Sequence, residues 1–189
     1  HKSFKNEIDK KIIKIKKKFY KNFCDIIFET IKLYSISKKE LSSRVTFENI
    51  DVINNHVSNQ ERVVVLTSHQ CNWEWLALAA EINLKTSLHF IYKKLSNPSF
   101  DEIMFKSRSR FGSVLIESKD AISKLKNNLD EINVLGLVAD QSPNKRNRKV
   151  WLKMLNQETP FFESVEYISK FSNSVVYFAS MKRKSRGFY

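Results

Sequence analysis

The 189-residue sequence has few cysteines, glycines or prolines and no long apolar run. Its two cysteines, Cys24 and Cys71, lie in unrelated contexts without metal-ligand spacing, which argues against a disulfide framework and fits a reducing cytoplasm. Three glycines, three prolines and 14 phenylalanines exclude a disordered chain. Because no stretch of about 18 apolar residues occurs, no segment is expected to span a bilayer as a helix.

The length and the apolar content together fit one compact domain. Hydrophobic residues make up 42% of the chain, enough for a core, and we expect a single domain over residues 1–189. The sequence opens on His1 rather than methionine, which is compatible with an anchor or signal further upstream. It stops at Arg186-Gly187-Phe188-Tyr189, which resembles a hairpin turn without its second strand, so we expect truncation at the C-terminus.

The charge of the chain is strongly positive. Thirty-three lysines and arginines against 20 aspartates and glutamates leave a net charge of +13. This excess favours an anionic partner: a phospholipid surface, a phosphorylated substrate, an acidic carrier protein or a nucleic acid. Charge by itself does not choose among these four.

Residues 1–45 are predicted to form a helical segment that begins with a long amphipathic helix. Its apolar positions recur every three or four residues: Phe4, Ile8, Ile12, Ile15, Phe19, Phe23, Ile27 and Ile31. The other face carries Lys5, Lys10, Lys11, Lys14, Lys16, Lys17, Lys18 and Lys21. Such a helix either lies in the headgroup region of an anionic membrane or packs on the domain with its lysines in water, and the two placements are compatible.

Residues 60–189 are predicted to form an α/β core. Ser37 with Glu40 resembles a capping box for a short second helix, and the polar stretch 54–62 marks a change of period. Short β-branched or aromatic runs follow at 63–66, 88–92, 114–116, 134–138 and 175–178, with helical segments at 73–82, 98–111, 121–129 and 162–171. This alternation predicts a central, mostly parallel sheet flanked by helices, with its active site at the carboxyl ends of the strands.

The candidate catalytic residues His69 and Glu74 follow the first predicted strand directly. Five helical residues would place them about 140° apart, so they can meet only if His69 precedes the helix. Asn72 is a suitable N-cap, and it would put Glu74 in the first turn, within hydrogen-bond reach of a histidine on the loop. A carboxylate on one imidazole nitrogen lets the other nitrogen remove a proton from a hydroxyl. As a bare spacing this pair is weak, because a structural histidine is the more common case.

Several ordered blocks resemble the bacterial lipid A biosynthesis acyltransferase family of the lysophospholipid acyltransferase superfamily. Ser-His-Gln-Cys-Asn-Trp-Glu-Trp (68–75) is similar to its Gly-His-x-Gly-Asn-Trp-Glu block, and Tyr92–Pro98 to its Tyr-Arg-x-Leu-x-Asn-Pro segment. Arg108–Gly112 resembles its Arg-x-Arg-x-Gly element, Ala139–Pro143 its Asp-Gln block and Thr159-Pro160 its threonine-proline. The similarity runs from about Phe19 to the end, and it implies a glycerolphosphate-acyltransferase-like fold.

The resemblance also implies a function in lipid metabolism, the acylation of a lipopolysaccharide precursor. His69 would be the general base and Glu74 its partner, while a hydroxyl of a lipid A precursor attacks an acyl thioester on acyl carrier protein or acyl-CoA. Arg110, with Arg108 and Lys93, would hold phosphate or the oxyanion; Asn72 would contact substrate, and Asp140 and Gln141 would orient the acceptor. No metal or other cofactor is implied, and the protein is expected at the cytoplasmic face of the bacterial inner membrane.

Two departures from the family pattern affect the loop, because Ser68 and Cys71 stand where glycine is usual. A third is Ser164-Val165-Glu166, which replaces a region where a glycine is common. Cys71 also suggests a cysteine nucleophile beside His69, but two residues along one tight loop is an awkward geometry for that pair.

Three other functions stay open at this point. The same dyad would serve a lysophospholipid or aminolipid O-acyltransferase, because it acts only on a hydroxyl. A basic nucleic-acid-binding module would explain the charge, but no binding motif supports it and no nucleic-acid partner is expected. A membrane-surface module without catalysis would leave the ordered blocks unexplained.

Overall fold

The computed structural model describes residues 9–145 and 147–189. A central five-stranded sheet carries strands in the order β3-β2-β4-β1-β7, and every neighbouring pair in it is parallel. The elements are α1 (Asp9–Lys32), α2 (Lys38–Arg44), α3 (Ile50–Ser58), β1 (Val63–Thr67), α4 (Trp73–Asn83), β2 (Leu88–Tyr92), α5 (Pro98–Ser109), β3 (Val114–Glu117), α6 (Ala121–Asn127), a 3-10 turn (Leu129–Glu131), β4 (Val134–Val138), β5 (Lys149–Met154), β6 (Gln157–Phe162), α7 (Ser164–Phe171) and β7 (Val175–Phe178).

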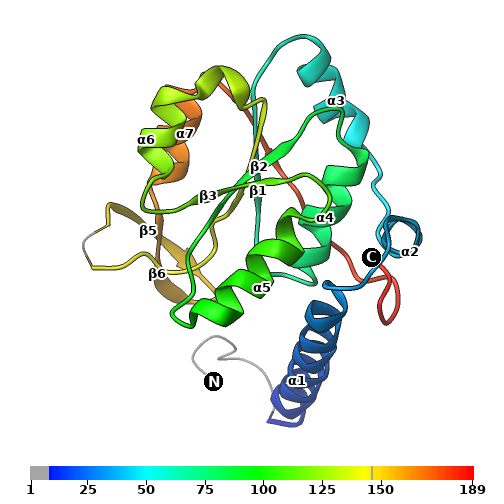
Figure 1. Ribbon diagram of the computed structural model, residues 1–189. Coiled ribbons are helices and arrows are strands. Elements are labelled where there is room, and N and C mark those ends of the chain that lie inside the picture. The colour runs from blue at the N-terminus through cyan, green and yellow to red at the C-terminus, as the bar shows by residue number, and fades with distance from the viewer. Residues whose placement is uncertain (1–8, 146) are drawn as a thin grey trace.

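Helices cover both faces of this sheet, as Figure 1 shows. On one face α6 and α7 bury Ala121, Leu125 and Ile168 against the strands. The opposite face is covered by α3 and α4, and α2 and α5 pack around the fully buried Trp75 of α4. Strands enclosed on both faces need continuous apolar runs, which is what the five β-branched segments provide. The predicted α/β class with a mostly parallel sheet is therefore confirmed.

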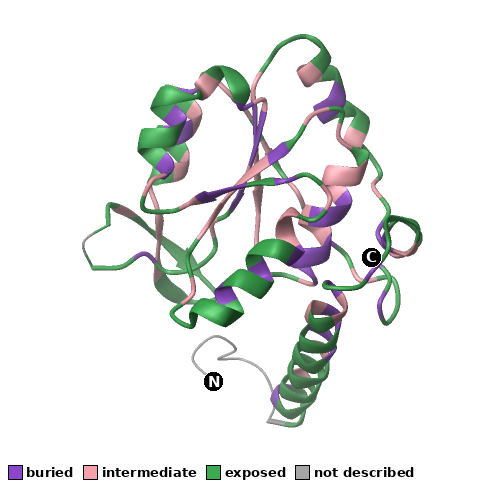
Figure 2. Cartoon of the chain, in the orientation of Figure 1, coloured by how far each residue is buried: buried purple, intermediate pink, exposed green. Residues whose placement is uncertain are grey.

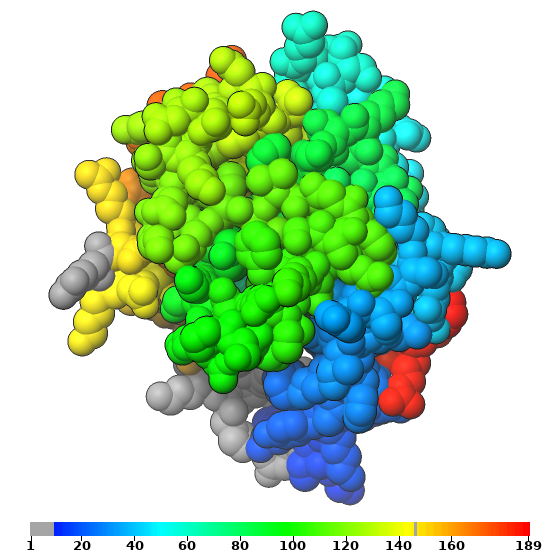
Figure 3. Space-filling model, viewed as in Figure 1, coloured from blue at the N-terminus to red at the C-terminus, as the bar shows by residue number. Residues whose placement is uncertain are grey.

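The N-terminal amphipathic helix is present as α1, and it lies at the margin of the domain (Figure 1 and Figure 3). Ile12 and Ile26 are buried, whereas the predicted apolar positions Phe19, Phe23 and Ile31 remain exposed, as the green surface of α1 in Figure 2 illustrates. The predicted positions Phe4, Lys5 and Ile8 lie outside the described residues. Within the described part of the chain, no helix is both long and apolar enough to cross a membrane.

Helix α3 and the β5–β6 hairpin were not predicted, because the residues of each disfavour the element locally. Helix α3 contains Asn54, which the sequence pattern marks as a break, yet its buried side chain donates to Asn83 O and accepts from Lys85 N. The antiparallel β5–β6 hairpin lacks the usual glycine in its turn, where Leu155 and Asn156 adopt φ values of 51° and 62°. In α3, the hydrogen bonds of Asn54 offset the poor local preference for a helix. In the hairpin, β5 is largely exposed and gains little from burial.

Candidate active site

His69 lies on the loop between β1 and α4, at the carboxyl end of the sheet, where the sequence predicts it. Asn72 ends this loop as the N-cap of α4, because its Oδ1 accepts a hydrogen bond from Trp75 N at 2.9 Å. Cys71 has φ 55°, a left-handed conformation that a side chain adopts at a cost. This accounts for glycine being usual at that position in the resembled family, and the loop of this chain keeps the turn despite the cysteine.

The carboxylate that contacts His69 is Asp140, which follows β4. His69 Nδ1 lies 2.6 Å from Asp140 Oδ1, and the backbone N–H of His69 donates to Asp140 Oδ2 at 2.9 Å. Strands β1 and β4 are parallel neighbours that end together at the Thr67–Val138 pair, so the residues after each strand meet. A carboxylate only accepts hydrogen bonds, so Nδ1 carries the proton and Nε2 keeps a lone pair when the ring is neutral.

The free face of the imidazole is bordered by Gln141 and Trp73. Gln141 Nε2 lies 3.2 Å from His69 Nε2, the contact expected of an amide donor and an imidazole lone pair. The Trp73 ring packs edge-on against the imidazole with ring centroids 4.8 Å apart. Together with Asp140, these contacts fix the orientation and the tautomer of His69.

Glu74 lies in the first turn of α4, as predicted, but it contacts a different group. Arg108 of α5 donates to both carboxylate oxygens, at 2.8 and 2.6 Å, and Trp73 Nε1 donates to Oε1 at 3.2 Å. Burial opposes the charge of Arg108, yet the hydrogen bond and the charge of Glu74 outweigh it and raise the pKa of the guanidinium. Among the described residues no hydrogen bond or ion pair joins His69 to Glu74, so their predicted contact is not seen and the role of Glu74 as partner stays a prediction.

The predicted cationic residues separate into two groups. Arg108 and Lys93 line the same cavity as His69 and Gln141. Arg110 does not line it: its Nη1 donates to Leu33 O at 2.8 Å, and its guanidinium stacks on the Phe111 ring. Arg110 therefore ties α5 to the end of α1, and the expected contact with phosphate or oxyanion is available to Arg108 and Lys93 instead.

Asn72, predicted to contact substrate, has a structural position instead. Its side chain is fully buried, and its Nδ2 donates to Glu29 Oε2 of α1 at 2.7 Å. The hydroxyl of Tyr189 donates to the same oxygen, and Trp75 Nε1 donates to Glu29 O. Burial, followed by the contact with Glu29, raises the pKa of Tyr189. Both polar ends of Asn72 are thus used: Oδ1 caps α4, and Nδ2 holds α1 against the loop that carries His69.

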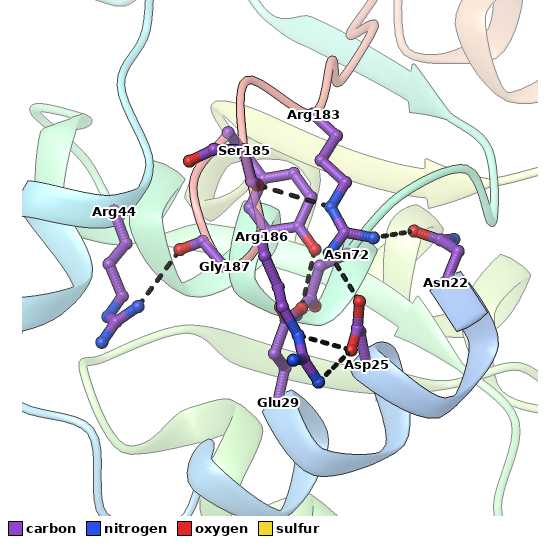
Figure 4. Close-up of polar contacts among 10 residues, drawn as sticks. Asn22, Asp25, Glu29, Arg44, Asn72, Arg183, Ser185, Arg186 and Gly187 are labelled. Atoms are coloured by element: carbon purple, nitrogen blue, oxygen red, sulfur yellow. Dashed lines mark hydrogen bonds and ion pairs between the residues drawn. The ribbon is translucent and has the colours of Figure 1, made fainter. Parts of the chain in front are cut away.

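A second group of contacts joins α1 to the C-terminal segment (Figure 4). Buried Asp25 accepts from Arg183 Nη2 at 2.6 Å and from Arg186 Nε at 2.9 Å, and Arg183 also donates to Asn22. Arg44 of α2 donates to Gly187 O in the same region. Sequence reading missed this network, because nothing in the local pattern indicates which carboxylate meets which arginine about 160 residues away.

A cavity of about 660 Å³ extends from His69 beneath α4. Polar side chains border it at the carboxyl edge of the sheet: His69, Glu74, Lys93, Arg108 and Gln141. Further in, its walls are apolar and come from Ile53, Val65, Ala77, Ala80, Leu84, Leu88 and Val134. Since Leu88 and Val134 begin β2 and β4, the cavity follows the sheet from the carboxyl ends of its strands to their amino ends.

Two alternative chemistries find no support in these contacts. Cys71 is half-buried, donates to Met181 O at 3.3 Å, and has its pKa raised by burial, which disfavours the nucleophilic thiolate. Across residues 9–145 and 147–189, no group of three or more histidine, cysteine and carboxylate side chains is placed to hold a metal ion.

Fold and site together define an α/β protein with an oriented histidine at the mouth of a largely apolar cavity, the kind of pocket in which enzymes bind hydrophobic substrates. The model of the bacterial lipid A biosynthesis acyltransferase family matches residues 5–189, and the chain belongs to this family. It is therefore an acyltransferase of lipid A biosynthesis. No curated protein matches the chain.

Proposed function

We propose that the protein transfers a fatty acyl chain from an acyl thioester, carried by acyl carrier protein, to a hydroxyl of a lipid A precursor. The observation that carries this proposal is the position of His69, whose Nδ1 is held by Asp140 and whose Nε2 lies beside Gln141 at the cavity. This geometry supplies a base for a hydroxyl next to a space for an acyl chain.

The reaction follows from these contacts. Nε2 of His69 takes the proton of the acceptor hydroxyl as its oxygen attacks the thioester carbonyl, and Asp140 stabilises the imidazolium that forms. The tetrahedral intermediate then collapses, the carbon–sulfur bond breaks, and the thiolate of the carrier receives the proton from His69. The products are an ester and a free thiol, without an acyl-enzyme intermediate.

The cationic side chains at the cavity act on the developing negative charge. Arg108 is held by both oxygens of Glu74, so its guanidinium is fixed without rearrangement during the reaction. We assign Arg108 and Lys93 to the oxyanion or to a phosphate of the acceptor. Glu74, predicted as the direct partner of His69, acts in this arrangement through Arg108 and through Trp73. The Trp73 indole donates to Glu74, and its ring packs against His69.

The apolar part of the cavity is assigned to the acyl chain. The volume of the whole cavity falls within the range of about 300–1,000 Å³ typical of small-molecule sites, and the depth of its apolar part along the sheet suits an extended chain. The acidic surface expected of the carrier protein suits the basic charge of this chain. The exposed aromatic and basic faces of α1 support peripheral association with the cytoplasmic face of the inner membrane.

The decisive experiment is acyl transfer by purified protein, measured by mass spectrometry with an acyl-carrier thioester and a panel of lipid A precursors and lysophospholipids. We expect His69→Ala to lower the rate by about 10²–10⁴-fold. His56→Ala is a matched control, because His56 also bonds a carboxylate, Glu61 at 2.7 Å, but does not line the cavity. Equal rates in the wild type and His69→Ala would remove His69 as the base, and acylation of lysophospholipids alone would replace the proposed acceptor.

A further inference from the structure

The β5–β6 hairpin carries several apolar side chains that are largely exposed. Strands β5 and β6 pair with each other from Lys149–Phe162 to Met154–Gln157. Five large apolar residues of the hairpin are 42–58% exposed: Val150, Trp151, Leu152, Met154 and Leu155. A soluble surface rarely gathers so much apolar area on one hairpin unless it binds something.

The turn of this hairpin adds to the cost of the exposure. Leu155 and Asn156 both have positive φ, which gives the turn that glycine, asparagine and aspartate normally occupy. Leucine is disfavoured in this conformation, and because Leu155 is 55% exposed, only part of its side chain is buried against the strain. The side chain at the tip is unfavourable for the isolated fold, and its burial in an external apolar phase would offset that cost.

Basic residues surround these apolar groups. Lys149 and Lys153 are two residues to either side of Trp151 in β5 and therefore share its face, while Lys145 and Arg148 precede the strand. Glu158 is the carboxylate that pairs in register with Lys153. None of the ion pairs found within the described residues involves these four cations. The hairpin thus carries Lys145, Arg148 and Lys149 at its base, apolar side chains along β5 and in its turn, and Lys153 opposite Glu158 next to the turn.

The position of the hairpin relates it to the active site. It follows Asp140 and Gln141 after β4, so it leaves the same edge of the sheet at which His69 lies. Helix α5 starts at this edge as well, and Phe100 and Ile103 in its first turns are 51% and 48% exposed. Exposed apolar groups therefore lie on elements other than α1 that leave the carboxyl edge of the sheet.

We infer that the β5–β6 hairpin inserts its tip into an anionic lipid surface and so places the cavity entrance against the bilayer. Apolar side chains occupy both faces of β5 and its turn, and a fluid phase can surround such a hairpin, whereas a rigid protein partner would cover one face. The cations at the base, Lys145, Arg148 and Lys149, then meet lipid phosphates, and Trp151, two residues further along β5, lies at the interface. The inference rests on the proposed function at one point: the bilayer is taken as the source of the acceptor lipid.

Trp151 is a local reporter of this contact. The chain has three tryptophans; Trp75 is buried and Trp73 is half-buried beside His69, so quenching by bromine-labelled lipid reports mainly on Trp151. With the full chain and vesicles of phosphatidylglycerol and phosphatidylcholine, we expect quenching that decreases as salt is added and increases with the fraction of anionic lipid. Trp151→Phe should remove most of it. Because α1 can also bind lipid, total vesicle binding is not the readout.

The matched variants separate the hairpin from a general apolar effect. Leu152→Glu with Leu155→Glu should reduce the Trp151 quenching at least severalfold, whereas Phe171→Glu, at an exposed position beside the amino end of β7, should leave it unchanged. Quenching that is absent in the wild type, or equal in the double variant, overturns the inference. So does protection of Trp151 by acyl carrier protein but not by vesicles, because the occupant would then be a protein.

Acyl transfer to a detergent-dispersed acceptor distinguishes the two proposals. The double hairpin variant should keep the wild-type rate there and lose rate only with acceptor in vesicles. Loss of both rates would show that the hairpin acts on the site itself, against the inference. A wild-type protein that inserts Trp151 but acylates no acceptor would refute the proposed function and leave the lipid contact standing.

Discussion

Glu74, at the start of α4, and Asp140, after β4, are both carboxylates at the carboxyl edge of the sheet, but their surroundings differ. The side chain of Glu74 is 8% exposed and accepts three hydrogen bonds, two of them from Arg108. That of Asp140 is 32% exposed, and its contacts are the backbone N–H and the ring of His69. One carboxylate therefore belongs to the interior and the other to a surface that substrate can reach.

This difference predicts that substitutions at the two residues affect different properties of the protein. An ion pair in the interior makes each partner dependent on the other, because removal of one leaves an uncompensated charge away from water. A partly exposed pair contributes little stability, since water solvates either group when the other is removed. Changes at Glu74 should thus appear first in folding, and changes at Asp140 first in catalysis.

The largest stability effect is expected for Glu74→Gln. The change leaves Arg108 buried without its carboxylate and should lower the free energy of unfolding by about 3–5 kcal/mol, measured by chemical denaturation. The matched double variant Glu74→Gln with Arg108→Met removes both charges and should recover most of that loss while remaining inactive. If the single variant is as stable as the wild type, Glu74 and Arg108 do not form a buried ion pair on which stability depends.

Asp25→Asn tests whether a second buried carboxylate behaves like Glu74. The hydrogen bond of Arg183 lowers the pKa of Asp25 against the opposing effect of burial, with Arg186 adding to it. A lowered folded pKa means that the stabilisation is complete above the unfolded value near 3.8 and is lost as pH falls through the folded value.

Asp25→Asn should therefore lower stability by about 1–3 kcal/mol at neutral pH, and the difference from the wild type should shrink in strong acid. Unfolding curves between pH 7 and pH 2 measure it. Glu102→Gln is the control, because Glu102 pairs with Lys106 on the exposed surface of α5. A difference that stays constant over this pH range would contradict the assigned ion pair.

The smallest stability effect, below about 1 kcal/mol, is expected for Asp140→Asn. Its rate effect should be large, about 10²-fold or more, because an amide nitrogen facing Nδ1 favours the tautomer that protonates Nε2. Acyl-transfer assays measure the rate, and unfolding curves measure the stability separately. Asp130→Asn, which removes a surface partner of Arg62, should change neither. A stable Asp140→Asn protein with the wild-type rate would show that Asp140 does not orient the base.

Much of the fold and part of the site could be predicted from local patterns. The five apolar runs became the strands of the sheet, Asn72 caps α4, and His69 precedes that helix at the end of β1. These features depend on a few neighbouring residues, so their signals lie within short windows. Helix α3 and the β5–β6 hairpin were missed because their residues contradict the usual preferences, in one case with tertiary compensation and in the other with an exposed turn.

By itself the sequence determined the elements, their alternation and the place of His69 at a strand end, together with the blocks that resemble the acyltransferase family. Only the tertiary structure decided which carboxylate meets that histidine. The order of the sheet sets β4 beside β1, so Asp140 reaches Nδ1 from 71 residues away, while α5 brings Arg108 to Glu74 and holds that nearer carboxylate in a buried ion pair. The choice depends on competition among partners distant in the chain, which a spacing of five residues does not encode.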